Sequence, residues 1–443
     1  MPDTIFYAII GTMFEYLIDV LIDLGPVVKM VFRLAPIWLP IMMVWAFSTM
    51  WLKWRRAMFI ASQEPVLLEI RVPKEIDKSP LAMELALNGF YATGDEGTWK
   101  DKYWKGGVRA WFSLELVSLE GQVKFFIWTW KKNVKNIQNH LYAQYPTVEI
   151  VEVPDYTMAF VLDRDSADVY AAEFALGKAD AYPIKTYIDY GLDRDPKEEY
   201  KIDPITPVIE YLGGLGRGEQ AWIQIIIRAH KDEDKKEGGL FAGIKSFEDL
   251  FFLVSKIQGQ LKPTDNWKDG VKKEIETIVE KRKIKGKVGE DGEDKGAVAL
   301  TMFEKDIVNA LERSISKLGF DVGVRVMYLA EKDAWNPGHK GAINGAFMQY
   351  NSPSLNSFKK VVGTSFDYWY EDPFGTKLPK MKKKLFNAYR ARSFFHPPRK
   401  GKKFVLNVEE LATIFHFPGG VAATPTFTKI ESKKSGPPSN LPV

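Results

Sequence analysis

The sequence predicts an α+β protein: an N-terminal transmembrane helix, then two ferredoxin-like (split βαβ) modules, then a C-terminal helical and linker segment. Two observations lead to this prediction. Residues 34–52 form an apolar run without an ionisable side chain, and residues 62–155 show a β-α-β-β-α-β order of hydrophobic patterns that 156–335 repeats more loosely. The chain has 443 residues, 46% of them hydrophobic, which is enough to bury two or three domain cores.

The composition excludes some kinds of chemistry. The chain has no cysteine, so it forms no disulfide, no thiolate metal site and no cysteine nucleophile. Its formal net charge is +4, which suits an anionic partner without requiring one, so the distribution of charge along the chain is more informative. The aromatic share of 13% argues against a disordered chain.

The apolar run at 34–52 is the predicted membrane anchor. About 20 apolar residues are needed to cross the ~30 Å hydrocarbon layer, so this run is just sufficient. Lys/Arg residues number four in 53–72 but two in 1–33, and the positive-inside rule then places the large C-terminal body in the cytoplasm of a single-pass inner-membrane protein. The alternative is a buried helix of a soluble protein. The candidate anchor residues are Trp38, Trp45, Trp51, Lys53, Arg55 and Arg56.

A second apolar segment, 5–24, is harder to interpret because it carries three acids. Glu15, Asp19 and Asp23 recur at i, i+4 and i+8 and therefore lie on one stripe of a helix. Three interpretations stay open: an amphipathic helix in the membrane interface, a second span whose acids face a partner, and a helix of a soluble protein.

The first module is expected at 62–155. Its predicted strands are 66–73, 108–119, 123–130 and 148–153. Its first helix begins at Ser79-Pro80, and its second helix carries Val134, Ile137, Leu141 and Tyr145 on one side. Ser79 is a suitable N-cap for the first of these helices, and Glu120-Gly121 forms the tight turn between the two middle strands.

The second module is expected at 156–335 and is interrupted by two charged inserts, 231–239 and 286–296, which are expected as surface loops. Its predicted elements are strands at 222–229 and 322–330 and a helix with an apolar stripe within 300–318. The predicted division of the chain is 1–33 amphipathic or membrane-associated helix, 34–56 transmembrane helix, 62–155 first module, 156–335 second module, 336–431 basic segment and capped helix, and 432–443 flexible tail.

No complete enzyme site is recognisable, and no catalytic, cofactor-binding or metal-binding residue is predicted. The nearest approach to a GxxxxGK[ST] phosphate loop is 238–246, where Ile244 separates the glycine from the lysine and destroys the register. The glycine-rich turn at 213–218 precedes a strand, so it lacks the helix N-terminus that binds a pyrophosphate. The five histidines are scattered, and none has a recognised metal spacing.

A basic stretch at 377–403 holds eleven Lys/Arg and no acid, with aromatic residues interleaved. Cations neutralise phosphates and aromatic rings stack on bases, so nucleic acid is one expected partner. An anionic lipid surface, a protein partner and a plain solvated surface are the alternatives. The candidate contact residues are Lys382, Lys383, Lys384, Tyr389, Arg390, Arg392 and Phe394.

A short capped helix is expected to follow within 406–419. Asn407 is placed to be its N-cap, and Glu410, three residues later, can close a capping box. Leu406 and Leu411 have the spacing of a hydrophobic staple, and Pro418-Gly419 is a stop signal.

The run 404–442, which contains ELATIFHFPG, Thr424-Pro425 and PPSNLP, resembles the segment that precedes the ATPase core in conjugation-type, type IV secretion-like DNA-transfer ATPases. The start of the body, PVLLEIRVPKEIDKSPLAMELAL at 65–87, resembles the membrane-anchored region of the same proteins, and WIQIIIRAH and LERSISKLGFDVGVRVMYLAE also fit. The resemblance covers the chain from about residue 34 to its end. In those ATPases a nucleotide-binding domain follows, whereas this chain ends at Val443.

The resemblance implies a non-enzymatic, membrane-anchored scaffold or accessory subunit of a type IV secretion-like (conjugation-type) transfer machine, which forms a homo-oligomer and docks a separate P-loop ATPase. The residues expected to dock this ATPase are Glu410, Leu411, Phe415 and Phe417. No cofactor is expected. Two other functions stay open: a stand-alone oligomeric structural protein of the membrane, and a membrane-bound enzyme with an unrecognised site.

Overall fold

The structure is a computed structural model that describes eight ranges of the chain. They are 33–73, 78–91, 98–163, 166–193, 203–231, 266–283, 300–366 and 368–419. The chain divides into two compact units. Unit 1 comprises 1–59, 98–107 and 233–262, and unit 2 comprises 60–97, 108–232 and 263–443. The segment 5–24 and the tail 432–443 lie outside the described residues.

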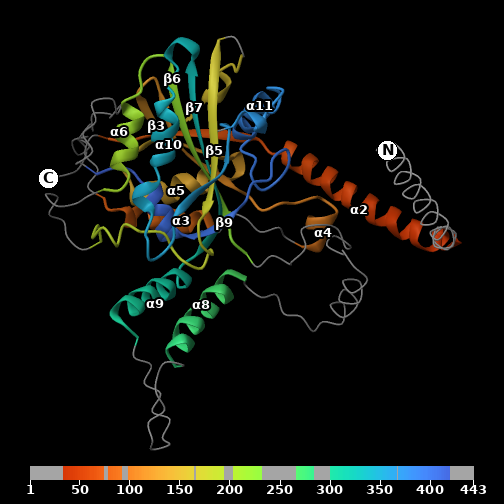
Figure 1. Cartoon of the computed structure of the whole chain (residues 1–443), viewed down its shortest axis with the longest axis horizontal. Coiled ribbons are helices and arrows are strands. Elements are labelled where there is room, and N and C mark those ends of the chain that lie inside the picture. The colour runs from red at the N-terminus through yellow and green to blue at the C-terminus, as the bar shows by residue number, and fades with distance from the viewer. Residues whose placement is uncertain are drawn as a thin grey trace, which may run out of the picture. The chain divides into compact units, whose positions relative to one another are not determined.

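Unit 2 is built on one nine-stranded sheet (Figure 1) in the order β4-β1-β3-β2-β6-β7-β5-β8, with β9 paired to β7. The strands are β1 (Pro65–Arg71), β2 (Phe112–Leu119), β3 (Gln122–Trp130), β4 (Glu149–Val153), β5 (Ala167–Leu176), β6 (Glu219–Ala229), β7 (Gly319–Glu331), β8 (Phe358–Gly363) and β9 (Phe404–Asn407). All the strand pairs are antiparallel. Unit 2 is therefore of the α+β class.

The prediction of two ferredoxin-like modules is wrong, because the strands expected for both belong to this single sheet. The two halves are joined where β2 pairs with β6, from Phe112 opposite Ile227 to Leu119 opposite Gln220. Both strands are buried on both faces, so ending either module at this edge would leave a row of backbone donors and acceptors unpaired in the interior. Pairing β2 with β6 satisfies them.

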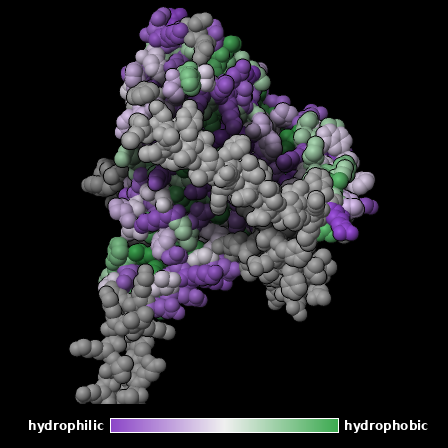
Figure 2. Space-filling view, turned by 45° about the vertical axis from the view of Figure 1, so that its right-hand side comes forward, coloured by the Kyte–Doolittle hydropathy of each residue, from purple (hydrophilic) through white to green (hydrophobic). Residues whose placement is uncertain are grey.

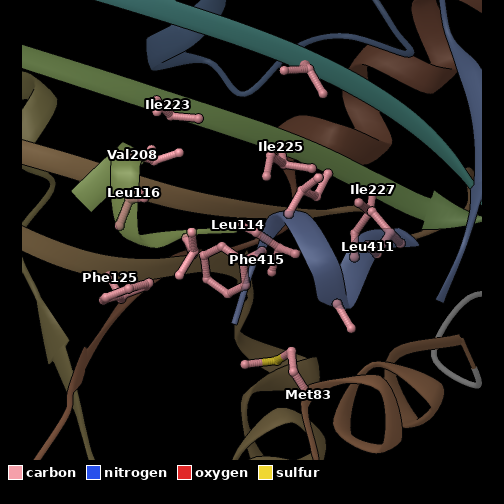
Figure 3. Close-up of a cluster of buried hydrophobic side chains, with 14 of the residues drawn as sticks. Met83, Leu114, Leu116, Phe125, Val208, Ile223, Ile225, Ile227, Leu411 and Phe415 are labelled. Atoms are coloured by element: carbon pink, nitrogen blue, oxygen red, sulfur yellow. The ribbon is translucent and has the colours of Figure 1, made fainter. Parts of the chain in front are cut away.

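One face of the sheet carries the hydrophobic core. Figure 3 shows Leu114 and Leu116 of β2 and Ile225 of β6 among side chains that pack against Leu411 and Phe415. The helices that add buried residues to this core are α3 (Pro80–Tyr91), α5 (Val134–Gln144), α6 (Thr206–Gly213), α10 (Gly338–Gly345) and α12 (Val408–Ile414). The helix predicted to begin at Ser79-Pro80 is α3, which starts at Pro80, and the helix predicted to carry Val134 and Ile137 on one side is α5.

The capping box predicted for α12 is confirmed. The Asn407 side chain accepts the backbone N–H of Glu410, and the Glu410 carboxylate accepts the backbone N–H of Asn407 at 2.8 Å. The helix ends at Ile414, ahead of the predicted stop at Pro418.

The other face of the sheet is covered by α11 (Lys377–Arg390) and by the segment 391–403 that follows it. Because side chains alternate along a strand, the residues next to the core-facing ones point to this side: Ser113 and Glu115 in β2, Gln224 in β6 and Arg325 in β7. The two faces therefore differ in chemistry, one apolar and one with buried polar groups.

Two helices, α8 (Asn266–Lys283) and α9 (Met302–Ile315), pack side by side in unit 2 (Figure 1) around Val271 and Leu311. The helix predicted within 300–318 is α9, and Thr301 caps it. Apart from Lys231, the predicted charged inserts lie outside the described residues. The short 3-10 helices are η1 (Lys131–Asn133), η2 (Tyr156–Met158), η4 (Lys332–Ala334), η5 (Met348–Tyr350) and η6 (Trp369–Glu371). On the face shown in Figure 2, hydrophilic residues cover most of the described surface.

Unit 1 contains α2 (Ala35–Ala61) and α4 (Trp99–Tyr103). The ring of Trp51 lies 5.9 Å from that of Trp104, and Arg55 Nε donates to the Trp104 carbonyl oxygen at 2.7 Å. Gly106, at φ +73°, brings the chain so close to α2 that a Cβ there would lie 2.4 Å from the Arg55 backbone. The predicted anchor residues Trp38, Trp45, Trp51, Lys53, Arg55 and Arg56 all belong to α2.

Among the described residues, no helix combines the length and the apolar character that a membrane crossing requires. This finding contradicts the predicted transmembrane helix at 34–56 and the predicted single-pass inner-membrane localisation with a cytoplasmic body. The helix α2 has 27 residues, but Pro40 lies inside it and Lys53, Arg55 and Arg56 occupy its second half. Charged side chains at such positions are costly in hydrocarbon.

The core position of Leu411 gives a first prediction. Leu411 is fully buried, so Leu411→Ala should lower the free energy of unfolding by about 2–5 kcal/mol through lost transfer energy and a residual cavity. Leu85 in α3 is 47% exposed, and Leu85→Ala should change it by about 0.5 kcal/mol or less. Urea unfolding followed by circular dichroism measures both. Equal midpoints for the two variants would contradict the packing of α12 in the core.

Candidate anion-binding site

The helix α11 presents one face to the sheet and the other to solvent. Leu385, Phe386 and Tyr389 are buried, whereas Lys380 and Lys383 are exposed. This is the amphipathic pattern of a helix that packs on a sheet through one side. The exposed lysines of the basic stretch therefore point to solvent from the first turns of α11.

The start of α11 is held by the carboxylate of Asp372. It accepts the backbone N–H groups of Thr376 at 2.9 Å, Lys377 at 3.1 Å and Leu378 at 2.9 Å. These bonds satisfy donors that have no partner within the helix, and they lower the pKa of Asp372, with the bond from Leu378 as the largest cause. The helix N-terminus is thus already occupied by a side chain of the protein.

A hollow of about 570 Å³ opens beside α11. We call it the lysine pocket. It is lined by Leu162, Ala167, Asp168, Lys332, Trp335, Leu378, Pro379, Lys380, Lys382 and Lys383. The lining comes from the start of β5 and the loop ahead of it, from Lys332 at the start of η4 and Trp335 just after η4, and from the first turns of α11. Four of these residues are lysines and one is a carboxylate, so the pocket favours anions.

The carboxylate of the pocket is engaged by its neighbours. Lys382 forms an ion pair with Asp168, and Asp168 Oδ1 also accepts the backbone N–H of Val169 at 2.7 Å. Lys332, Lys380 and Lys383 are exposed. These three ammonium groups leave the pocket with a surplus of positive charge that a phosphate or carboxylate ligand would neutralise.

The ring of Trp335 is the aromatic wall of the pocket. It packs on Tyr328, with ring centroids 5.0 Å apart. The ammonium groups of Lys340 and Lys382 lie 5.4 and 5.9 Å from the centroid of Trp335. Cations this close to an indole face are attracted by its quadrupole, so the ring helps to gather positive charge at the pocket.

A row of four polar side chains crosses the sheet beneath α11. We call it the polar row. Glu115 of β2 lies opposite Gln224 of β6, Gln224 lies opposite Arg325 of β7, and Arg325 lies opposite Glu173 of β5. All four are buried. Gln224 Nε2 donates to Glu115 at 3.0 Å, and Arg325 Nη2 donates to Glu173 at 2.8 Å.

The segment after α11 supplies the cations that the polar row lacks. Arg392 donates to both oxygens of Glu115, at 3.0 and 3.2 Å, and also pairs with Asp155. Arg399 pairs with Glu173. Three arginines and three carboxylates thus balance one another, with Arg399 and Asp155 half-buried at the edge of the group, and this pairing is the condition under which buried charges are tolerated.

The electrostatic consequence appears in two of these acids, the buried Glu173 and the half-buried Asp155. Burial raises the pKa of Glu173, but hydrogen bonds and charge from Arg399 and Arg325 outweigh it and leave the pKa lowered. Burial likewise raises the pKa of Asp155, and Arg392 outweighs it. Both carboxylates are therefore held in the charged form that the arginines need.

The predicted nucleic-acid contacts divide between these two environments. Lys382 and Lys383 line the lysine pocket, and Lys384 is exposed on α11. Arg390 lies partly exposed beside the ring of Phe386. The other three, Tyr389, Arg392 and Phe394, are buried and hold the chain to the sheet. Those three side chains do not form a surface that a ligand can contact.

Phe394 is fitted between two glycines. A Cβ at Gly323 of β7 or at Gly401 would lie 2.3 Å from its ring, which real Cβ atoms do not tolerate. The ring therefore occupies space that only these glycines leave open, and it fixes the segment 391–403 against the polar face of the sheet.

The predicted ATPase-docking residues Glu410, Leu411, Phe415 and Phe417 are buried beneath the core-bearing face. The Glu410 carboxylate also accepts the backbone N–H of Ile184 at 2.8 Å, and its burial raises its pKa to about 8. Phe415 and Phe417 pack edge-on against Phe125. In this conformation the four side chains stabilise α12 in the core and are out of reach of a partner.

Sequence reasoning missed Asp168, Lys332, Trp335 and Lys380. Lys380 lies inside the basic stretch and could have been included, but the others are separated from it in the sequence and gave no signal. Among the described residues no group of three or more His, Asp or Glu could hold a metal ion. His416, for instance, is buried and pairs with Asp203 at 2.9 Å.

Fold and site together define an α+β protein with a lysine-lined pocket on the polar side of one antiparallel sheet. The chain belongs to a family described as a domain of unknown function (DUF8128), whose model matches residues 99–429. That range includes every residue of the lysine pocket and of the polar row. No curated protein matches the chain.

The polar row gives a second prediction. Arg392→Met should lower the free energy of unfolding by about 3–5 kcal/mol, because Glu115 is left buried without its cation. Arg390→Met, the same change at a partly exposed position, should cost about 1 kcal/mol or less. Chemical denaturation of both variants measures the difference. Restoring part of the loss with Glu115→Gln in the Arg392→Met background would support the pairing, and similar losses in the two arginine variants would refute it.

Proposed function

We propose that this protein is a non-enzymatic accessory subunit of a conjugation-type DNA-transfer machine and that it binds nucleic acid through the phosphate groups in its lysine pocket. The observation that carries the binding proposal is the set of exposed lysines that line one hollow beside α11. The resemblance of 404–442 to the segment ahead of the ATPase core in DNA-transfer ATPases supports the accessory role and a separate P-loop ATPase as partner.

The spacing of the lysines suits a polyanion. Lys380 and Lys383 are three residues apart on α11, and Lys384 is four residues from Lys380, so Lys383 and Lys384 each lie ~5–6 Å from Lys380 at Cβ. A phosphodiester chain presents a charge at each nucleotide and can engage several of these ammonium groups at once. A small monoanion would engage one or two.

The pairing within the pocket favours binding over catalysis. Asp168, the one acid in the lining, is held by Lys382 and by the backbone of Val169. Both partners belong to the chain itself, so this carboxylate is already engaged in an ion pair and a backbone hydrogen bond. The remaining ionisable lining groups are lysines, which suit the recognition of phosphate.

The proposal predicts an electrostatic binding reaction. A labelled 20-nucleotide single strand should bind the full chain at low salt in a fluorescence-anisotropy titration. Lys380→Ala with Lys383→Ala should weaken this binding and reduce the slope of log K against log salt by about 1.4, since each lysine–phosphate contact that is lost contributes about 0.7 for a single strand.

The matched control is Lys272→Ala with Lys273→Ala, which removes two exposed lysines of α8 and makes the same change in net charge. It should leave the salt slope within about 0.3 of the parent value, because a change in net charge without the loss of a phosphate contact affects the slope only slightly. Lys332 is unsuitable for this comparison because the neighbouring carboxylates of Glu331 and Asp333 offset its positive charge. Equal effects of the two double variants, or no binding by the parent at low salt, would refute the proposal.

A further inference from the structure

Three exposed aromatic side chains lie immediately ahead of α11, in the segment 368–374 that we call the aromatic loop. Tyr368 and Tyr370 are each 60% exposed, and Phe374 is 87% exposed. The rings of the two tyrosines are stacked, with centroids 5.2 Å apart and an angle of 11° between their planes. A group of large aromatic faces open to water is characteristic of a binding surface.

The aromatic loop is held in place by its own hydrogen bonds. The Asp372 carboxylate joins it to the first turn of α11, and Lys377 Nζ donates to the Glu371 carbonyl oxygen at 3.0 Å. Gly375 donates its N–H to the Asp372 carbonyl oxygen at 3.0 Å and has φ +62°, a conformation that favours glycine. The rings are thus presented by a preorganised turn, which lowers the entropy lost when a ligand binds.

The aromatic loop adjoins the lysine pocket. Lys380 is six positions after Phe374, so their Cα atoms are at most ~20 Å apart even if the chain were extended, and the turn at Asp372 shortens this distance. A ligand only a few nucleotides long can therefore contact lysines and aromatic rings together.

We infer that the aromatic loop is a base-stacking platform and that the ligand of this face is single-stranded nucleic acid. This inference rests on the proposed phosphate binding in the lysine pocket and names its ligand more closely. Bases within a duplex are stacked on one another, so only a single strand offers base faces to Tyr368, Tyr370 and Phe374. The lysines hold the backbone, and the rings hold the bases.

The test compares three ligands of equal length: a thymidine single strand, the same strand in a duplex, and an abasic deoxyribose-phosphate strand. In the full chain, Tyr368→Ala with Tyr370→Ala should weaken binding of the thymidine strand about 5- to 100-fold, the range that stacking of one base supports. The salt slope and the affinities for the duplex and the abasic strand should stay unchanged, because those ligands offer no base face.

Two variants control for structure. Tyr368→Phe with Tyr370→Phe keeps both rings and should retain the parent affinity for the thymidine strand. Tyr142→Ala removes another exposed tyrosine, 40% exposed in α5 on the core-bearing side of the sheet, and should have no effect. The midpoint of thermal unfolding of the double alanine variant should match that of the parent. If the midpoints differ, the affinity of the double phenylalanine variant is compared with that of the parent instead.

The outcomes separate the inference from the proposed function. Loss of binding in Lys380→Ala with Lys383→Ala, together with unchanged binding in the tyrosine variant, would overturn the base-stacking platform and leave phosphate binding standing. If the aromatic loop docks a protein and not nucleic acid, the same two results are expected. Equal weakening of thymidine and abasic strands would also overturn it. Absence of binding to all three ligands by the parent would refute the proposed function and this inference together.

Discussion

The polar row is the constraint on which the rest of unit 2 depends. Glu115 and Arg325 are both fully buried within a sheet, where an unpaired charge costs several kcal/mol. The sheet itself supplies two carboxylates and one arginine to the row, so it needs cations from another part of the chain. Arg392 and Arg399 provide them, and this requirement places the segment after α11 on the sheet.

Because of that placement, the basic stretch 377–403 has residues in two roles: two of its arginines pair with carboxylates of the sheet, and lysines of α11 face solvent. Its buried arginines make forked, bidentate contacts with carboxylates, a geometry that guanidinium groups fit and ammonium groups do not. Its lysines in α11 are directed outward, where a compact and well-hydrated charge is tolerated. The lysine pocket is therefore a consequence of internal pairing: once the arginines are fixed to the sheet, α11 lies with Lys380 and Lys383 beside Trp335.

Local patterns in the sequence predicted local structure well. The strand predicted at 123–130 and the capping residues Asn407 and Glu410 correspond to β3 and α12, because each depends on neighbours a few residues away. Pairings between residues far apart in the sequence could not be predicted from it. Arg392 and Glu115 are 277 positions apart, and nothing near Arg392 in the sequence shows that its partner is an acid in β2.

The same limit explains the two errors of architecture. The pairing of β2 with β6 is decided by which strand edges meet, and a strand pattern does not reveal its neighbour, so one sheet was predicted as two modules. The residues Lys53, Arg55 and Arg56 were interpreted as the cytoplasmic edge of a span at 34–52, whereas the helix α2 continues through them to Ala61 and also contains Pro40. The site was predicted in part. The basic composition of 377–403 indicated Lys382 and Lys383, whereas only the folded structure shows that Trp335 and Asp168 lie beside them.

The central claim is that the outer face of α11, fixed by the polar row, is the ligand-binding face of this protein. Amide hydrogen exchange of the full chain, with and without a thymidine single strand at low salt, tests it most directly. Slower exchange confined to the aromatic loop, the first turns of α11 and the η4 segment, 332–335, is the predicted result. Unchanged exchange there, or protection confined to α3 and α5 on the core-bearing face, would contradict the claim.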